Sequence, residues 1–228
     1  MPSIDAVIVA AGSGARLGYT IPKAFVDLCG KPLFMHSCEK FDTYKLIGSI
    51  VLVVPAEKTN EAIEIISKGN FTKKVRVVAG GKERWQSVQN GVEASPGPWV
   101  LIHDAARPFV SHAVIDSVLE KQANYDCVIT VTPEVDTIRH FVNDRALTTL
   151  DRSSVVRVGT PQLFKTSLLK EAFLKALSLN PPPTDEAMLM EACGIPVGIA
   201  WGDPLNFKIT TKSDLTLAEA LCALNGVR

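Results

Sequence analysis

Glycines and other small residues fill the stretch 10–18, directly after the apolar run 6–9. Backbone N–H groups in such a loop can form a cradle for an anion, because glycine places no Cβ between the chain and a phosphate. Arg16 and Lys23 add positive charge within this loop and just after it. These residue types predict a site for a nucleoside triphosphate. A tight turn without any ligand would also use glycines in this way.

The loop fits neither of the two common phosphate-binding motifs. A Walker P-loop has Lys and then Ser or Thr after its second glycine, but Ala15 and Arg16 follow Gly14 here. The dinucleotide fingerprint GxGxxG runs into a helix, whereas the spacing in 12–18 is GxGxxxG and Pro22 stands where that helix would continue. The sequence therefore predicts a phosphate loop of another kind.

Two further polar turns follow predicted strands. Gly80-Gly81 comes after 75–79, and Asp104 comes after 99–103. Because ligands of open α/β sheets bind outside the carboxyl ends of the strands, we expect these turns to converge with the first loop. An acid at the place of Asp104 can bind a magnesium ion that is carried by phosphates. The alternative is an aspartate that caps its own loop or pairs with Arg107.

Neither the histidines nor the cysteines predict a metal site. His103 is expected to be packed or hydrogen-bonded, and the other histidines have no partners at ligand spacing. The five cysteines are odd in number, scattered and without a CxxC pair. Free thiols in a reducing compartment, and hence a cytoplasmic protein, are the expected interpretation.

Composition excludes several classes of protein. The chain has 228 residues, of which 46% are hydrophobic, so a disordered or fibrous protein is excluded. Its 24 basic and 24 acidic residues give no net charge, which argues against a nucleic-acid partner. Apolar runs such as 50–54 are too short to span a bilayer, and the first residues lack the basic region of a signal peptide. We expect neither a nucleic-acid nor a membrane partner.

Strands and helices alternate through the first 131 residues. The predicted strands are 6–9, 49–54, 75–79, 99–103 and 127–131, and the predicted helices are 32–41, 57–68, 84–93 and 111–124. Such βα repeats with short connections predict an α/β fold. We expect a single Rossmann-like, doubly wound and mostly parallel sheet, with helices on both faces because the crossovers are right-handed.

The alternation breaks between 132 and 160. Residues 136–141 and 146–150 predict a β-hairpin that turns at Asn143-Asp144. An isolated hairpin of this composition is marginally stable, so it must pack on something. Two interpretations stay open with equal weight: a surface insertion, or an arm exchanged with a second subunit to give a symmetric dimer.

The last third returns to α/β structure. A helix over 164–179, the rigid spacer 180–183, a helix capped by Thr184, a strand over 196–201, an extended piece over 206–210 and a closing helix over 213–224 are predicted. No internal repeat or composition break divides the chain. We expect a single domain over 1–228, with 133–155 as an extended arm.

Several motifs, in order along the whole chain, carry a resemblance to a known family. They are 10–18 with Pro22-Lys23, 80–84 with Ser87-Val88, 103–108, Asp136-Thr137, Asp151-Arg152, 160–162, 184–187 and 206–210. The first resembles the signature of sugar-phosphate nucleotidyltransferases, and the set resembles the 2-C-methyl-D-erythritol 4-phosphate cytidylyltransferase family. The chain departs from the family pattern at Ala24, where glutamine is usual, and at Leu205, where an acid or a small polar residue is usual.

The resemblance implies that CMP is transferred from CTP to 2-C-methyl-D-erythritol 4-phosphate, with pyrophosphate as the second product, in non-mevalonate isoprenoid synthesis. It implies Arg16, Lys23, Arg152 and Lys208 as catalytic residues and Mg²⁺ as cofactor, with Asp104 as its ligand. Expected CTP contacts are Ala10, Ala11, Gly12, Gly14, Gly81, Ser87, Asp104, Ala105 and Arg107. Expected sugar-phosphate contacts are Thr137, Arg152, Thr160 and Thr184.

In the family the hairpin reaches over the neighbouring subunit, so the resemblance implies a homodimer in which Thr137 and Arg152 act across the interface. Two other functions remain as alternatives. One is a cytidylyltransferase for another polyol phosphate, such as ribitol 5-phosphate. The other is a non-catalytic nucleotide-binding regulator, against which the presence of Arg16, Lys23, Asp104 and Lys208 together argues.

Overall fold

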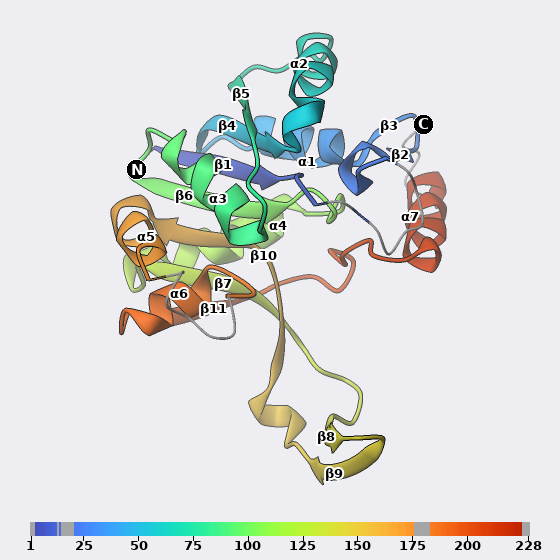
Figure 1. Cartoon of the computed structure of the whole chain (residues 1–228), viewed down its shortest axis with the longest axis vertical. Helices are drawn as coiled ribbons and strands as arrows, with labels where there is room; N and C mark the ends of the chain where they lie inside the picture. Colours follow the sequence, from blue (N-terminus) through green and yellow to red (C-terminus); the bar gives the residue numbers. More distant parts are fainter. Residues whose placement is uncertain (1–2, 13, 15–20, 176–182, 225–228) are drawn as a thin grey trace.

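A seven-stranded sheet in the order β11-β7-β10-β6-β1-β4-β5 forms the centre of the molecule (Figure 1). The computed structural model describes residues 3–12, 14, 21–175 and 183–224. The strands are β1 (Ile4–Val9), β4 (Ile47–Val54), β5 (Lys74–Ala79), β6 (Trp99–Asp104), β7 (Cys127–Pro133), β10 (Val156–Lys165) and β11 (Val197–Trp201). All neighbouring pairs are parallel except those that β10 makes with β6 and β7. The predicted mostly parallel α/β sheet is confirmed.

Helices cover both faces of this sheet, as predicted. On one face lie α1 (Leu33–Asp42), α2 (Thr59–Ser67) and α4 (His112–Leu119); on the other lie α3 (Arg84–Glu93), α5 (Thr166–Phe173) and α6 (Ala187–Ala192). Successive strand residues point to opposite faces, so Ile8 joins the first core and Val7 the second. Both cores bury strands as continuous apolar runs, which is why those runs were recognisable in the sequence.

A third, smaller core holds the segment of Lys23 against the end of the chain. It joins the short hairpin of β2 (Asp27–Leu28) and β3 (Lys31–Pro32) to α7 (Lys212–Leu224). Val26, Ile209 and Leu215 are among its buried residues. The segments 23–26 and 206–210 are therefore packed side by side.

Four short 3-10 helices complete the described elements: η2 (Lys23–Phe25), η3 (Ala56–Lys58), η4 (Glu120–Ala123) and η5 (Arg152–Ser154). Among the described residues, no helix has the length and apolar character needed to cross a bilayer. All five cysteines are free thiols, as expected.

The central strand β10 was not predicted, and it corrects the expected boundary of the following helix. Residues 164 and 165 end this strand, and the helix begins at Thr166. Pro161 argues against a strand, because proline cannot donate to a ladder. It lies where the register of β10 against β7 shifts, between Gly159 and Gln162, so the missing donor interrupts no regular pairing. Residues 176–179 of the predicted helix lie outside the described residues.

The expected cap of the next helix is also corrected. Helix α6 begins at Ala187, and the Asp185 carboxylate, not the Thr184 hydroxyl, accepts a hydrogen bond from the backbone of Met188, at 3.2 Å. The Thr184 hydroxyl instead contacts the Met188 sulfur at 3.2 Å. Glu186 turns away from this helix end toward Arg84.

The predicted hairpin is confirmed and projects away from the sheet (Figure 1). Its strands are β8 (Arg139–Val142) and β9 (Arg145–Thr149), and both turn residues, Asn143 and Asp144, have positive φ. Every residue of the two strands is exposed, including Phe141 at 73%. We call residues 133–155 the arm. Within one chain none of its apolar side chains is fully buried, and only Ile138, Leu150 and Val155 are partly buried.

Candidate active site

A cavity of about 430 Å³ opens where β1, β5 and β6 end. Its lining includes ten of the predicted site residues: Ala10, Ala11, Gly12, Gly14, Lys23, Gly81, Ser87, Asp104, Ala105 and Lys208. The three loops therefore converge as the strand order requires. Arg16 lies outside the described residues.

Contacts between backbone segments explain two of the glycines. A Cβ on Gly14, which has φ of +69°, would lie 2.5 Å from the Cβ of Lys23. A Cβ on Gly80 would lie 2.5 Å from the Cβ of Ala11, so the first two loops touch. Next to this contact, the Ser87 hydroxyl accepts a hydrogen bond from the backbone of Gly81 at 3.0 Å. At these two positions a side chain would collide with the neighbouring segment, so glycine allows the segments to meet beside the cavity.

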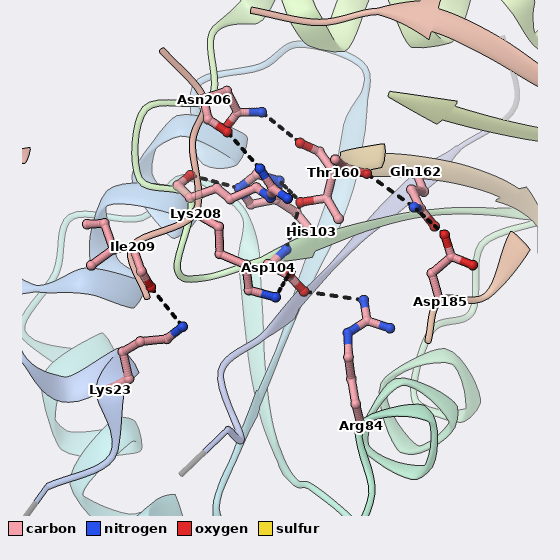
Figure 2. Close-up of polar contacts among 12 residues, drawn as sticks. Lys23, Arg84, His103, Asp104, Thr160, Gln162, Asp185, Asn206, Lys208 and Ile209 are labelled. Carbon is pink, nitrogen blue, oxygen red and sulfur yellow. Dashed lines mark hydrogen bonds and ion pairs between the residues drawn. The ribbon is translucent and has the colours of Figure 1, made fainter. Parts of the chain in front are cut away.

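Lys23 reaches the cavity from η2. Its Nζ donates to the carbonyl of Ile209 at 2.9 Å, so it ties the first loop to the segment 206–210 (Figure 2). The third core holds both segments from behind. An ammonium fixed in this way can bind phosphate without first losing much rotamer freedom.

Asp104 is the centre of a charged cluster at the end of β6 (Figure 2). Its Oδ1 lies 3.3 Å from Nη2 of Arg84, and its Oδ2 accepts from Nζ of Lys208 at 2.6 Å. Burial alone would raise the pKa of this carboxyl, but Arg84 and Lys208 outweigh burial and hold the pKa well below its ordinary value. Asp104 stays ionised and keeps both cations in place.

Arg84 continues this cluster to a second carboxylate. Its Nη1 donates to both oxygens of Glu186, at 2.7 and 2.9 Å, and Glu186 is only 1% exposed. Burial raises the pKa of the Glu186 carboxyl, and Arg84 opposes that shift. Arg84 is therefore not an ordinary surface charge, because its guanidinium is bound between two acidic side chains.

His103 and Thr160 form an internal link beneath the cavity. Thr160 Oγ1 lies 3.0 Å from Nδ1 of His103 and accepts from the backbone of Asp104 at 3.1 Å. Nε2 of His103 lies 3.0 Å from the carbonyl of Arg107. Burial lowers the pKa of His103 to about 4, so the ring is neutral near pH 7. The predicted hydrogen-bonded role of His103 is confirmed, and neither ring nitrogen is free to act as a base.

A smaller cavity, of about 230 Å³, adjoins the first and shares Lys208 with it. Its cationic lining residues are Arg107, Arg157 and Lys208. Nη1 of Arg107 donates to the carbonyl of Asn206 at 2.9 Å, while its buried Nε and the buried Oδ1 of Asn206 have no hydrogen-bond partner. Arg107 therefore faces this second cavity and does not line the first.

Four predicted sugar-phosphate contacts do not line either cavity. Thr160 lies beneath the cavity floor, and Thr184 contacts Met188. Thr137 and Arg152 belong to the arm, where Nη1 of Arg152 donates to the carbonyl of Val135 at 3.0 Å. A single chain does not bring the two arm residues to the phosphate loop.

Sequence reasoning did not pair Arg84 with Glu186, and it left Thr210 without a role. Arg84 and Thr210 both line the first cavity. One signal for Arg84 was its place just after the glycine turn at Gly81, at the first position of α3. Its partner Glu186 is 102 positions away, and no local pattern predicts such a contact.

The residues present fit a magnesium ion that a substrate carries. Within the described ranges, no three His, Cys, Asp or Glu residues form a metal-binding group. Asp104 accepts one contact on each oxygen, and a carboxylate has about four acceptor positions, so it can add one ligand bond. Magnesium commonly binds through one or two carboxylates together with substrate phosphates.

The sequence matches one family of known proteins over nearly its whole length. Residues 4–223 match the family profile described as IspD: 2-C-methyl-D-erythritol 4-phosphate cytidylyltransferase. A protein of that name from Bacteroides thetaiotaomicron is 38% identical over 216 residues, which cover 94% of this chain and 97% of the relative.

Solved structures agree with the sequence matches. The 4-diphosphocytidyl-2C-methyl-D-erythritol synthase of Anaerococcus prevotii superposes with a TM-score of 0.85 at 28% identity, over 97% of this chain and 99% of that chain. The 2-C-methyl-D-erythritol 4-phosphate cytidylyltransferase of Thermus thermophilus superposes with a TM-score of 0.78 at 30% identity, over 95% and 98%. In each case the similarity spans nearly the whole of both chains.

Proposed function

The chain belongs to the 2-C-methyl-D-erythritol 4-phosphate cytidylyltransferase family, and from that premise we propose how its residues carry out the family's reaction. The enzyme transfers CMP from CTP to 2-C-methyl-D-erythritol 4-phosphate and releases pyrophosphate. The convergence of the glycine loop, Lys23 and the Asp104–Lys208 pair on one cavity is the observation that carries the proposed roles.

The 430 Å³ cavity holds CTP. Backbone N–H groups of Ala11, Gly12 and Gly14 and the ammonium of Lys23 bind its triphosphate. The sequence predicts Arg16 as a further cation from the same loop. Gly81 and Ser87 line the same cavity beside this loop, where they contact the nucleoside. Ala105, directly after Asp104, also lines this cavity.

The reaction needs charge stabilisation more than a base. A phosphate oxygen of the acceptor forms a bond to the α-phosphorus of CTP while the bond from that phosphorus to the pyrophosphate oxygen breaks. The attacking phosphate is already ionised near neutral pH, since the second pKa of a phosphate monoester is about 6. Lys23 and Lys208 stabilise the negative charge on the α-phosphoryl oxygens and hold two anions in line. The engaged ring nitrogens of His103 are consistent with a mechanism that uses no histidine base.

Mg²⁺ is the proposed cofactor, with Asp104 as its single protein ligand. When bound, the ion neutralises part of the triphosphate charge. Asp104 holds Lys208 as well, so its carboxylate also sets where that ammonium meets the substrate.

The acceptor lies toward the second cavity. Arg107, Arg157 and Lys208 supply positive charge there, which suits the phosphate of the acceptor. Thr160 and Thr184 remain predicted contacts; from its position beneath the floor, Thr160 acts through His103 and Asp104.

The arm completes the acceptor site from a second copy of the chain. Its exposed apolar side chains, among them Val135, Phe141 and Leu147, give a surface that a partner subunit would cover. Thr137 and Arg152 then reach the site of that partner. The single domain over 1–228 is thus one half of a homodimer, and its five free thiols fit a reducing compartment such as the cytoplasm.

Pyrophosphate release tests the proposal. Purified protein with CTP and Mg²⁺ is given 2-C-methyl-D-erythritol 4-phosphate, ribitol 5-phosphate or no acceptor, and the same acceptors are repeated with ATP, GTP and UTP. Release with CTP and the methylerythritol phosphate alone is expected. Release only with ribitol 5-phosphate would assign the other polyol specificity, and CTP binding without release from either acceptor would favour the regulator.

A further inference from the structure

Arg84 bridges two buried carboxylates that come from distant parts of the chain. Nη1 binds both oxygens of Glu186, at 2.7 and 2.9 Å, and Nη2 lies 3.3 Å from Oδ1 of Asp104. The other oxygen of Asp104 holds Lys208 at 2.6 Å. These four residues form a row of alternating charges, Glu186–Arg84–Asp104–Lys208, which we call the ionic row.

The far end of the ionic row is not positioned to touch a substrate. Glu186 is 1% exposed, does not line either cavity, and both of its carboxylate oxygens accept from Arg84. A buried carboxylate costs several kcal/mol unless a cation and hydrogen bonds compensate it. What Glu186 provides is a fixed anchor for the guanidinium.

The ionic row also connects four separate segments. Arg84 opens α3 between Glu83 and Gln86, the two residues of its capping box. Asp104 ends β6, Glu186 precedes α6, and Lys208 lies in 206–210. A guanidinium is planar and carries its donors in a fixed fork, so it can hold two carboxylates in set directions. The position of Lys208 therefore depends on Arg84 through Asp104.

We infer that Arg84 and Glu186 are positioning residues: Glu186 fixes Arg84, and Arg84 holds the Asp104 carboxylate in the orientation that presents Lys208 to the reacting phosphate. This inference rests on the proposed function. Two other roles for Arg84 make different predictions. It could bind the triphosphate directly, since it lines the cavity, or it could merely neutralise Glu186.

The test compares single and double variants by steady-state pyrophosphate release. Arg84→Gln alone leaves Glu186 buried without a cation, so it is paired with Arg84→Gln/Glu186→Gln, which removes both charges and preserves the fold. Asp104→Asn and Arg84→Gln/Glu186→Gln/Asp104→Asn complete a mutant cycle. Arg76→Gln is the matched control, because Arg76 donates to the carbonyl of Ala94 at the other end of α3.

Arg84→Gln/Glu186→Gln is expected to lower kcat by about 30-fold, less than the roughly 10²- to 10³-fold found when a charge-stabilising donor itself is removed, because Lys208 stays in place. The KM for CTP should stay within about threefold. In the Asp104→Asn variant the same two changes should lower kcat little further, because the residue through which Arg84 positions Lys208 is already changed. Glu186→Gln alone should lower kcat less than the double variant does, since Asp104 still binds Arg84.

Three results would overturn the inference. Wild-type kcat in Arg84→Gln/Glu186→Gln would show that Arg84 only neutralises Glu186. A large rise of KM for CTP would indicate direct triphosphate binding. Losses that multiply in the triple variant would show that Arg84 does not act through Asp104. Failure of the proposed function looks different, because wild type and Arg76→Gln would then release no pyrophosphate.

Discussion

The two ends of the molecule that carry predicted site residues differ in how they are held. At the phosphate loop, the Asp104 side chain is 9% exposed and contacts two cations. On the arm, Arg152 is exposed and its guanidinium donates to one backbone carbonyl, that of Val135. The first region is held by buried contacts within its own chain, whereas the arm is a paired hairpin whose two strands are fully exposed. In the proposed function, CTP therefore binds within one chain, and the acceptor is bound by residues of two chains.

Substitution of Lys23 tests the CTP cavity and should give the largest loss of activity. Lys23→Ala should reduce kcat by about 10³-fold, the upper range for removing one charge-stabilising donor, because no other described side chain occupies its place beside Ile209. Steady-state pyrophosphate release measures the loss, and circular dichroism checks the fold. Lys175→Ala is the control, since Lys175 also donates to a backbone carbonyl, that of Ala192. Near-normal turnover would remove Lys23 from the mechanism.

The arm can be tested by mixing subunits. Arg152→Ala should lower kcat/KM for the acceptor by about 100-fold, with KM for CTP unchanged, because a lost positioning contact acts only on the substrate it holds. If the arm acts across the dimer, mixing Arg152→Ala with Lys23→Ala subunits creates one intact site per mixed dimer. Random exchange then restores about one quarter of wild-type activity. Mixtures as inactive as the parents would place Arg152 in the site of its own chain.

Buried His103 predicts that the free energy of unfolding of the domain that carries the sheet depends on pH. The pKa of His103 is about 4 in the folded protein and about 6.5 when unfolded, so the unfolded chain binds the extra proton between these values. The free energy of unfolding should therefore fall by about 2 kcal/mol between pH 7.5 and pH 5.0 through this residue. Denaturant titration of wild type and His103→Gln at both pH values measures the difference. Equal falls in the two proteins would contradict it.

A substitution at the tip of the arm should have the smallest effect on the stability of the monomer. Phe141 is 73% exposed, so Phe141→Ser should change the free energy of unfolding of the monomer by no more than about 0.5 kcal/mol. It should nevertheless weaken the dimer and the use of the acceptor, because the partner loses an apolar contact. Sedimentation velocity at several concentrations separates the two effects. A dimer as stable as the wild type would show that the arm does not hold it.

Sequence patterns predicted the parts of the fold that rest on local regularity. Buried strands read as apolar runs, and the turn at Asn143-Asp144 follows from residues that accept positive φ. Because parallel strands end at one edge, the convergence of Gly14, Gly81 and Asp104 followed from topology alone. These inferences needed no knowledge of tertiary contacts.

What the sequence did not show depends on distant partners. Strand β10 was missed because Gly159 and Pro161 interrupt its pattern, and only its neighbours β6 and β7 make it a strand. Arg84 and Glu186 look like ordinary helix-start charges until the fold places them together. Local propensity carries no information about contacts made across 102 positions.

The central place of β10 has a consequence for how the chain folds as it is synthesised. Strands β1, β4, β5 and β6 are neighbours, so they can pair as soon as they have been made. Strand β7 has no neighbour among them, because β10 fills the position between β6 and β7 and follows both in sequence. Until residue 165 has left the ribosome, β7 lacks the strand that links it to β6. Assembly of the sheet therefore requires that β10, an antiparallel strand, joins β7 to the strands made earlier, and β11 then adds to the free edge of β7.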